Sequence, residues 1–476
     1  MVPSENIKSV SRFNLYTLVS LWSFVLGILI ASFVFVSPLV CILIIFVAFA
    51  IYFVEKHTLI LIALVALSLG AFRYDIKDFH ILLPAGSTGI VVSEPEHRDL
   101  DTRLVVKTDT GEKVLVTTDL LSEVEYGDEI RIFSQAKALK PGSYADYLSK
   151  DDIFYTVNSK IEIISRDNGN PIKSFLLKIK NALVERMKLV LPEPESSLLA
   201  GLIVSGKQAL PSSVLDGFRK AGVVHIVVLS GYNITIIAEF LFLIFGFWGG
   251  RRAAVASAFG VIFFTIMSGG AATVVRGAIM VLLVLLGRII KRQGHSGRIL
   301  LFTAVLMLMW NPKDLVFDPS FQLSFLALIG LIYGTPIVEK FLTKIPEKFG
   351  LRTIISATLA TQALVFPYLL YNMGSFSLVF LLSNLLILPI LPVVMLLGFV
   401  GTLVAFISTI LAWPVVFASH LLLSWVLSIA DFLGNLSFAS IRTEEFPLWA
   451  TLLLYTMLGL ILWRKRGYPQ QSSSLG

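Results

Sequence analysis

Residues 39–54 read LVCILIIFVAFAIYFV, an uninterrupted apolar run between Pro38 and Glu55. A helix of this length nearly crosses the hydrocarbon core of a bilayer, which is about 30 Å thick. Similar runs flank it at 15–36 and 58–72. The 476-residue chain is 56% hydrophobic and 15% charged, whereas soluble domains carry about 25% charged residues. We therefore predict a polytopic α-helical membrane protein, with the lipid bilayer as its main solvent.

The residue inventory excludes several kinds of site. Cys41 is the single cysteine, so the chain has no internal disulfide and no cysteine-based metal site. The histidines lack metal-ligand spacings, and Lys207 lacks the upstream glycine of a phosphate-binding loop. The first apolar run is of full span length and is no cleavable signal peptide. We expect no metal, no cofactor and no ATPase activity in this chain.

Residues 76–168 form an inserted domain of a different character. Short alternating runs predict five strands, and Asp109–Glu112 predicts a hairpin turn. Five short strands with this spacing indicate a small closed sheet, most simply an OB-type barrel, and the same count also fits other small β-barrels. The predicted strands are 89–92, 103–107, 113–117, 129–133 and 154–157.

The third part, 169–466, begins with an amphipathic helix at 172–190. The moderately apolar stretch 196–219 follows, which is too polar to span and is expected to form short interfacial or re-entrant helices. Apolar runs then return, and a polar tail, 467–476, follows them. We expect the first part, 1–75, to hold three spans. The later runs are 223–248, 253–268, 272–290, 299–311, 320–336, 352–371, 376–392, 394–412, 415–432 and 447–463.

The distribution of Lys and Arg predicts the orientation. Lys8 and Arg12 place the N-terminus in the cytoplasm, so three crossings put the β-domain outside. If every later run crossed, the basic residues 464–466 would lie outside. One run therefore does not cross, and we expect it to be 376–392, which contains Asn384, Pro389 and Pro392. Broken backbone at membrane depth is tolerated where it is buried or lines a cavity, so this run is a candidate pore element.

Polar residues inside the apolar runs are the candidates for a substrate path. Arg276 either faces the bundle interior or reaches the outer headgroups. The other candidates either line a conduit or hold helices together by hydrogen bonds. The expected lining is His225, Ser230, Gly231, Asn233, Arg276, Asp318, Gln322, Ser324, Gln362 and Asn384.

A serine and a histidine inside a membrane also suggest a hydrolase. On one continuous helix His225 and Ser230 point about 140° apart and do not pair. The enzyme hypothesis therefore needs a nucleophile from another helix. A transporter of another polymer or of lipid is a third hypothesis.

Six segments in order resemble the ComEC family, the inner-membrane channel of natural transformation. They are PGSYADYL (141–148), GLIVSG (201–206), FRKAGVVHIVVLSG (218–231), VRGAIM (275–280), DPSFQLSF (318–325) and NLLILP (384–389). The resemblance implies a channel that passes single-stranded DNA across the cytoplasmic membrane. It also implies a cytoplasmic helicase-like ATPase and a DNA receptor protein as partners.

The chain departs from the family pattern at three places. Asn233 stands where the family usually has histidine. The metallo-β-lactamase-like domain of many members is not expected here, so we expect a separate nuclease. Residues 94–152 carry more Asp and Glu than Lys and Arg, and an acidic surface repels phosphate. Contact of the β-domain with DNA then needs a local patch, for which the candidates are Arg131, Lys137 and Lys140.

Overall fold

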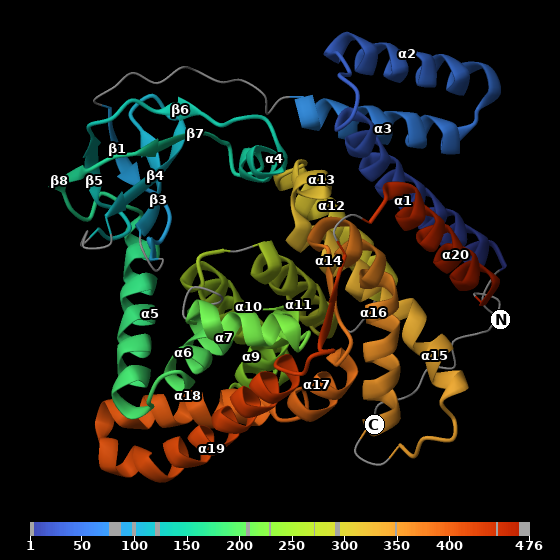
Figure 1. Cartoon of the computed structure of the whole chain (residues 1–476). Coiled ribbons are helices and arrows are strands. Elements are labelled where there is room, and N and C mark those ends of the chain that lie inside the picture. The colour runs from blue at the N-terminus through green and yellow to red at the C-terminus, as the bar shows by residue number, and fades with distance from the viewer. Residues whose placement is uncertain are drawn as a thin grey trace. The chain divides into compact units, whose positions relative to one another are not determined.

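The computed structural model describes ten stretches of the chain (Figure 1). They divide between two compact units, Met1–Leu176 with Ile279–Gln322, and Leu177–Ala278 with Leu323–Gly476. We call them unit 1 and unit 2. The described residues are 4–75, 87–97, 101–119, 124–205, 210–227, 230–270, 272–290, 296–347, 350–443 and 446–465.

Unit 1 begins with three helices, α1 (Ser4–Ala31), α2 (Pro38–Glu55) and α3 (Thr58–Asp75), which coincide with the three predicted apolar runs. Of the three, α2 is long and apolar enough by itself to cross a membrane, and the apolar parts of α1 and α3 are shorter. α1 and α3 cross at Gly27 and Gly70. A Cβ added at Gly27 would overlap the carbonyl oxygen of Leu67, and one at Gly70 would overlap that of Phe24. Glycine at both positions lets the two backbones touch, as small residues do at helix contacts in membranes.

The sheet of unit 1 contains all five predicted strands, as β1, β3, β4, β5 and β7, together with three strands that the pattern missed. Inward residues such as Leu104, Val106 and Val116 are fully buried. The order is β6-β7-β4-β3-β1-β5-β8, with β2 beside β3 and with β4 parallel to β7. The strands are β1 (Thr88–Val91), β2 (Glu96–His97), β3 (Asp101–Thr108), β4 (Lys113–Asp119), β5 (Glu129–Ile132), β6 (Lys137–Ala138), β7 (Ile153–Asn158) and β8 (Ile161–Ser165).

The predicted hairpin is present between β3 and β4, where Gly111 adopts a φ of 90°. Only glycine takes such a φ without strain. In the described residues the sheet is open, because β6 and β8 end the strand order without pairing to each other. The closed OB-type barrel stays a prediction.

A short helix, α4 (Ser143–Ser149), connects this sheet to the end of α12 (Ser296–Trp310) and to α13 (Asp314–Phe317). The Asn311 amide donates to the Lys150 carbonyl at 2.9 Å and to the Asp314 carboxylate at 2.6 Å. The Lys313 ammonium lies 5.2 Å from the centre of the Phe154 ring on β7. These contacts hold the sheet against the helices of unit 1.

Lys150 is nearly buried at this junction. Burial acts to lower the pKa of its ammonium group, but Asp151, whose carboxylate it contacts at 2.8 Å, and Asp318 raise the pKa above its usual value. The charge of Lys150 is therefore retained although water is largely excluded.

Among its described residues, unit 2 is helical apart from one short strand pair, β9 with β10. α5, α11 and α14 contribute to both units. The helices outside unit 1's own set are α5 (Pro171–Val190), α6 (Glu195–Ala200), η1 (Gly201–Ser205), α7 (Ser212–Lys220), α8 (Val224–Val227), α9 (Gly231–Ile244), η3 (Gly246–Trp248), α10 (Gly250–Met267), α11 (Ala272–Ile290), α14 (Pro319–Ile329), η4 (Gly330–Gly334), α15 (Thr335–Phe341), α16 (Leu351–Met373), α17 (Phe380–Ile387), α18 (Leu391–Ile407), α19 (Thr409–Gly434) and α20 (Leu448–Lys465), and the strands are β9 (Ser375–Ser377) and β10 (Ser440–Arg442).

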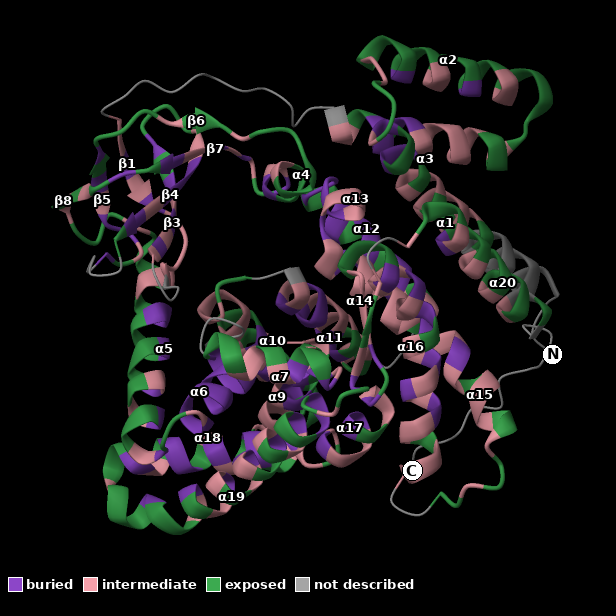
Figure 2. Cartoon of the chain, in the orientation of Figure 1, coloured by how far each residue is buried: buried purple, intermediate pink, exposed green. Residues whose placement is uncertain are grey.

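Burial separates the helices into two kinds (Figure 2). α6 is buried at every residue, whereas α2 buries only Cys41 and Ala48 although it is apolar throughout. An apolar helix with an exposed apolar surface is what a lipid environment requires. In the described residues six helices are long and apolar enough to cross a membrane, or seven if the bent pair α17–α18 is one span.

Two predicted spans are not continuous helices. The run 376–392 contains an eight-residue helix, α17, and a bend of 46° separates it from α18. Eight residues rise only about 12 Å, so the prediction that this run is broken is confirmed. The run 223–248 was predicted as one span, and this was wrong, because Ser230, within the run, has extended backbone and is the N-cap residue of α9.

We predict that Gly27→Ala weakens unit 1, because the new methyl group would force α1 away from α3. Overpacking of this kind costs about 1–3 kcal/mol. The measurement is the apparent melting temperature of the detergent-purified chain. Gly459→Ala in α20 is the matched control, since nothing lies within 4 Å of the position that its methyl group would take. Equal melting temperatures of the two variants would contradict the close crossing.

Candidate functional site

The interruption between α8 and α9 places Ser230 in extended backbone, with a φ of −104° and a ψ of 166°. Its hydroxyl donates to the Asn233 amide oxygen at 3.2 Å. The expectation that His225 and Ser230 share one helix was wrong, because α8 and α9 are separate elements. The argument from helical spacing therefore does not apply, but the observed hydroxyl points to an amide acceptor.

The Asn233 side chain also hydrogen-bonds to a second irregular segment, η1. Asn233 is 1% exposed, and its amide nitrogen donates to the carbonyl of Leu202 at 3.1 Å. Leu202 lies in η1, a π-helix. Such wide turns are rare and are frequent at functional sites. The Asn233 side chain thus joins two breaks in helical backbone.

The third component is a close crossing of α9 and α11. A Cβ on Gly277 would lie 2.7 Å from the Cα of Gly231. Arg276, next to Gly277, is 2% exposed, and its guanidinium carbon lies 5.8 Å from the centre of the Phe325 ring. A cation at this distance from an aromatic face is weakly attracted to it. We call Ser230, Gly231, Asn233, Arg276 and Gly277 the crossing site.

Arg276 therefore faces the interior of unit 2, since its side chain is buried. An arginine that reached the outer headgroups would be exposed. Buried cations in membrane segments are costly and are usually kept for function.

The other candidates on unit 2 are more dispersed. His225, on α8, is exposed, while Val223 and Ile226 on either side of it are buried.

Gln362 and Ser324 are partly buried, on α16 and α14. Asn384, on α17, is 6% exposed, and its amide oxygen has no hydrogen-bond partner among the residues that the structure describes. A buried acceptor without a partner costs about 1–3 kcal/mol. Asn384 therefore remains a candidate for contact with substrate or water.

Asp318 and Gln322 belong to unit 1, where the side chains of both residues cap helix ends. An Asp318 carboxylate oxygen accepts from the Ser320 backbone nitrogen at 2.9 Å. The Gln322 amide donates to the carbonyls of Leu315 and Val316 at 2.9 and 2.7 Å. These bonds satisfy the backbone groups that α13 and α14 leave open. A place for either residue in the substrate path stays a prediction.

The three basic candidates of the β-domain do not lie on neighbouring strands. Arg131, on β5, forms an ion pair with Glu162 at 3.4 Å, while Lys137 lies on β6 near the other end of the strand order. Lys140 is exposed after β6. In the described residues there is no group of three or more His, Cys, Asp or Glu side chains that would hold a metal ion.

The sequence patterns missed one polar cluster, which joins Glu195, His420 and Ser424. His420 lies inside the predicted apolar run 415–432. A titratable residue in such a run was the available signal, because these residues rarely occur in spans without a partner.

The model of the Competence protein family matches residues 202–467, which is more than half of the chain. The chain belongs to the Competence protein family. The crossing site lies inside the matched segment, as do Gln362 and Asn384. The family resemblance that the six motifs predicted is confirmed.

A relative of this Competence family member is ComE operon protein 3 of Bacillus subtilis (strain 168). The two are 27% identical over 333 residues, which cover 68% of this chain and 41% of the relative. The chain therefore matches less than half of the relative's length. No solved structure matches the chain.

We predict that Asn233→Leu destabilises unit 2 more than Ser230→Ala does. The leucine leaves the Leu202 carbonyl without its donor, at a cost of about 1–3 kcal/mol. The Ser230 hydroxyl is less buried, and its loss leaves Asn233 bonded to Leu202. Apparent melting temperatures of the two purified variants measure the difference. If Ser230→Ala were the less stable variant, the contact between Asn233 and η1 would not hold the breaks together.

Proposed function

We propose that this protein is a membrane channel that passes single-stranded DNA into the cytoplasm during natural transformation. The observation that carries the proposal is the buried Arg276 at the Gly231–Gly277 crossing, inside the segment that the family model matches. The neighbouring Phe325 ring offers its aromatic face to the cation, and the hydrogen-bonded Ser230 hydroxyl and Asn233 amide add uncharged polar groups.

The electrostatics favour an anionic substrate. A strand of DNA carries one negative charge per nucleotide and needs a path of cations, amides and backbone dipoles. Arg276 supplies a charge that cannot be lost, because a guanidinium stays protonated in proteins. Its fork also fits a phosphate with two parallel hydrogen bonds.

Interrupted helices in unit 2, the unit that contains Arg276, supply backbone dipoles. η1, the break between α8 and α9, and the bend between α17 and α18 all lie in unit 2. Irregular backbone at membrane depth is tolerated where it is buried in protein or lines a watery cavity. We assign the lining to the crossing site together with His225, Ser324, Gln362 and Asn384 of unit 2, and Asp318 and Gln322 of unit 1 stay separate candidates predicted from the sequence.

The β-domain is proposed as an OB-type domain outside the cytoplasm. An OB-fold is a partly open five-stranded barrel, and the open strand order with its parallel β4–β7 pair supports this assignment. Its sequence is acidic, so we limit its DNA contacts to Lys137, Lys140 and Arg131 with stacking on aromatic rings such as Phe133, which is exposed.

The proposed orientation has both termini in the cytoplasm and the chain in the cytoplasmic membrane. A channel supplies no driving force, so we propose a cytoplasmic helicase-like ATPase, a DNA receptor protein and a separate nuclease as partners. The enzyme alternative receives no support from the geometry, since the Ser230 hydroxyl donates to Asn233 instead of to an imidazole.

We predict that Arg276→Met abolishes DNA uptake and that Arg276→Lys retains part of it. Methionine keeps the length and the apolar stem but removes the charge, whereas lysine keeps the charge and loses the fork. The measurement is the entry of labelled DNA into native host cells at matched protein amounts. Arg288→Met is the control, because Arg288 is an exposed arginine at the other end of α11.

If the Arg276→Met variant took up DNA at the wild-type rate, Arg276 would not be part of the DNA path. Loss of uptake with equal loss of another transported polymer would favour a less selective transporter.

We predict that a cysteine at position 160, introduced as Lys160→Cys with Cys41→Ala, reacts with a membrane-impermeant thiol reagent in intact cells. Lys160 is exposed between β7 and β8. The control is Lys340→Cys in α15, which the charge distribution places inside, so it should react only after lysis. The reverse pattern would invert the proposed orientation.

A further inference from the structure

The β-domain contains a pocket that none of the sequence motifs indicated. Its volume is about 370 Å³, within the range of about 300–1,000 Å³ that small-molecule sites occupy. β1 forms one wall, the end of β3 forms another, and the segment 168–170, which directly precedes α5, forms a third. The lining residues all belong to unit 1. The pocket therefore lies where the β-domain joins α5.

The wall next to α5 is held in place by the protein itself. The Tyr126 hydroxyl accepts from the Asn170 backbone nitrogen at 3.1 Å, and the Gly127 carbonyl accepts from the Asn168 backbone nitrogen at 2.8 Å. A Cβ on Gly169 would lie 2.6 Å from the Tyr126 ring, so the absence of a side chain lets this segment pack closely. The pocket is therefore formed before any ligand binds, as most ligand sites are.

Lys173, in the first turn of α5, is also part of this wall. Its ammonium donates to the Val92 carbonyl at 2.9 Å and lies 4.3 Å from the centre of the Tyr126 ring. Burial lowers the pKa of this ammonium, and the charge of Glu94 opposes that effect. The charge of Lys173 is thus already compensated within the protein.

Two opposite charges line the pocket without pairing to each other. Lys107 is exposed on β3, and Asp109 is exposed directly after this strand. Residues two apart in a strand lie on the same side of it, so both side chains are available to one ligand. In the described residues neither forms an ion pair, although the Asp109 carboxylate accepts from the Thr88 hydroxyl. A cation and an anion that share a pocket but do not pair fit a ligand that carries both charges.

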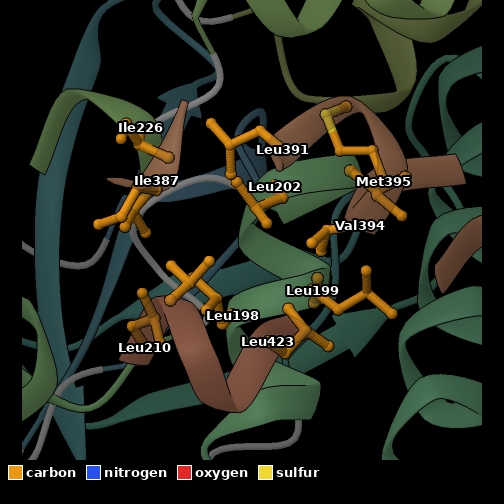
Figure 3. Packing of buried hydrophobic residues seen from close by; sticks show 14 of the residues in the cluster. Leu198, Leu199, Leu202, Leu210, Ile226, Ile387, Leu391, Val394, Met395 and Leu423 are labelled. Carbon is orange, nitrogen blue, oxygen red and sulfur yellow. The ribbon is translucent and has the colours of Figure 1, made fainter. Parts of the chain in front are cut away.

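An exposed apolar surface begins at the same junction. Ile172 and Phe175, in the first turns of α5, are 58% and 63% exposed. The later part of α5 is covered, because Leu183 and Met187 belong to the apolar core of unit 2, whose packing Figure 3 shows. An amphipathic helix places such exposed apolar side chains at the boundary between lipid headgroups and acyl chains. The junction therefore combines charges for a headgroup with an apolar surface for acyl chains.

We propose that the pocket at the start of α5 binds the headgroup of a zwitterionic phospholipid of the phosphatidylethanolamine type. The phosphate contacts Lys107 and the ammonium contacts Asp109, while the acyl chains lie along Ile172 and Phe175. A single strand of DNA fits this lining less well, because it has phosphates but no cation for Asp109. The bound lipid holds the start of α5 at the level of the headgroups. This inference does not depend on the proposed channel function.

The test is native mass spectrometry of the full-length chain in detergent, titrated with phosphatidylethanolamine or with phosphatidylglycerol, which has the phosphate but no ammonium. The measurement is the dissociation constant of the first bound lipid. We expect phosphatidylethanolamine to bind about three-fold more tightly, which is the effect of one partly exposed ion pair.

Two charge variants separate the two contacts. Asp109→Asn binds both lipids equally, because the ammonium loses its counter-charge while the amide oxygen still accepts from Thr88. Lys107→Gln weakens both lipids by a similar factor, because both carry the phosphate. The controls are Asp119→Asn and Lys160→Gln, which change exposed residues outside the pocket and leave both constants unchanged. An unchanged lipid preference in Asp109→Asn would overturn the proposed site.

Glycerophosphoethanolamine, the same headgroup without acyl chains, tests the source of the ligand. At the concentration of the lipid we expect it not to displace phosphatidylethanolamine, whereas replacing both Ile172 and Phe175 by serine weakens both lipids. Both side chains are exposed, so this change leaves the fold intact. Displacement by the free headgroup or by a single-stranded oligonucleotide, or unchanged lipid binding by the serine variant, would overturn the assignment to a phospholipid.

Discussion

In a bilayer every backbone amide and carbonyl has to find its partner within the protein, and the irregular parts of this chain depend on that constraint. Where η1 departs from the α-helical pattern, the Leu202 carbonyl is bonded by the Asn233 side chain. Where α12 ends, the Arg73 guanidinium donates to the carbonyls of Met309 and Trp310 at 2.8 Å each. In both places a polar side chain from a distant part of the sequence donates to a carbonyl that the helix leaves open.

Close packing of backbones is the second device that shapes both units. Gly27 with Gly70 in unit 1 and Gly231 with Gly277 in unit 2 bring helices together without intervening side chains. Gly330 in η4 does the same against the Ala360 carbonyl, which lies 2.7 Å from the position of an added Cβ. In lipid there is no hydrophobic force between helices, so such contacts provide much of their association. At the Gly231–Gly277 crossing the same closeness places Arg276 beside two interrupted helices.

Three buried or nearly buried charges in the described residues are each accompanied by a compensating group. Arg276 lies over an aromatic ring, Lys150 contacts Asp151, and Glu195 has a hydroxyl and an imidazole beside it. The energetic reason is common to all three, because a lone charge away from water costs far more than a compensated one. The crossing site and the Glu195–His420 pair are therefore separate polar sites, linked by α6 and η1 within one unit.

The amino-acid sequence by itself determined the membrane character, the three N-terminal helices, the five main strands with their hairpin, and the broken run at 376–392. These follow from local patterns of hydropathy, period and turn residues, which act over a few neighbouring residues. The family also followed from short motifs. Only the tertiary structure decided that α8 and α9 are separate, that Gln322 caps α13, and that Glu195 meets His420 across 225 positions of chain. Such outcomes depend on which distant side chain satisfies a backbone group or a buried charge, and no local pattern encodes that choice.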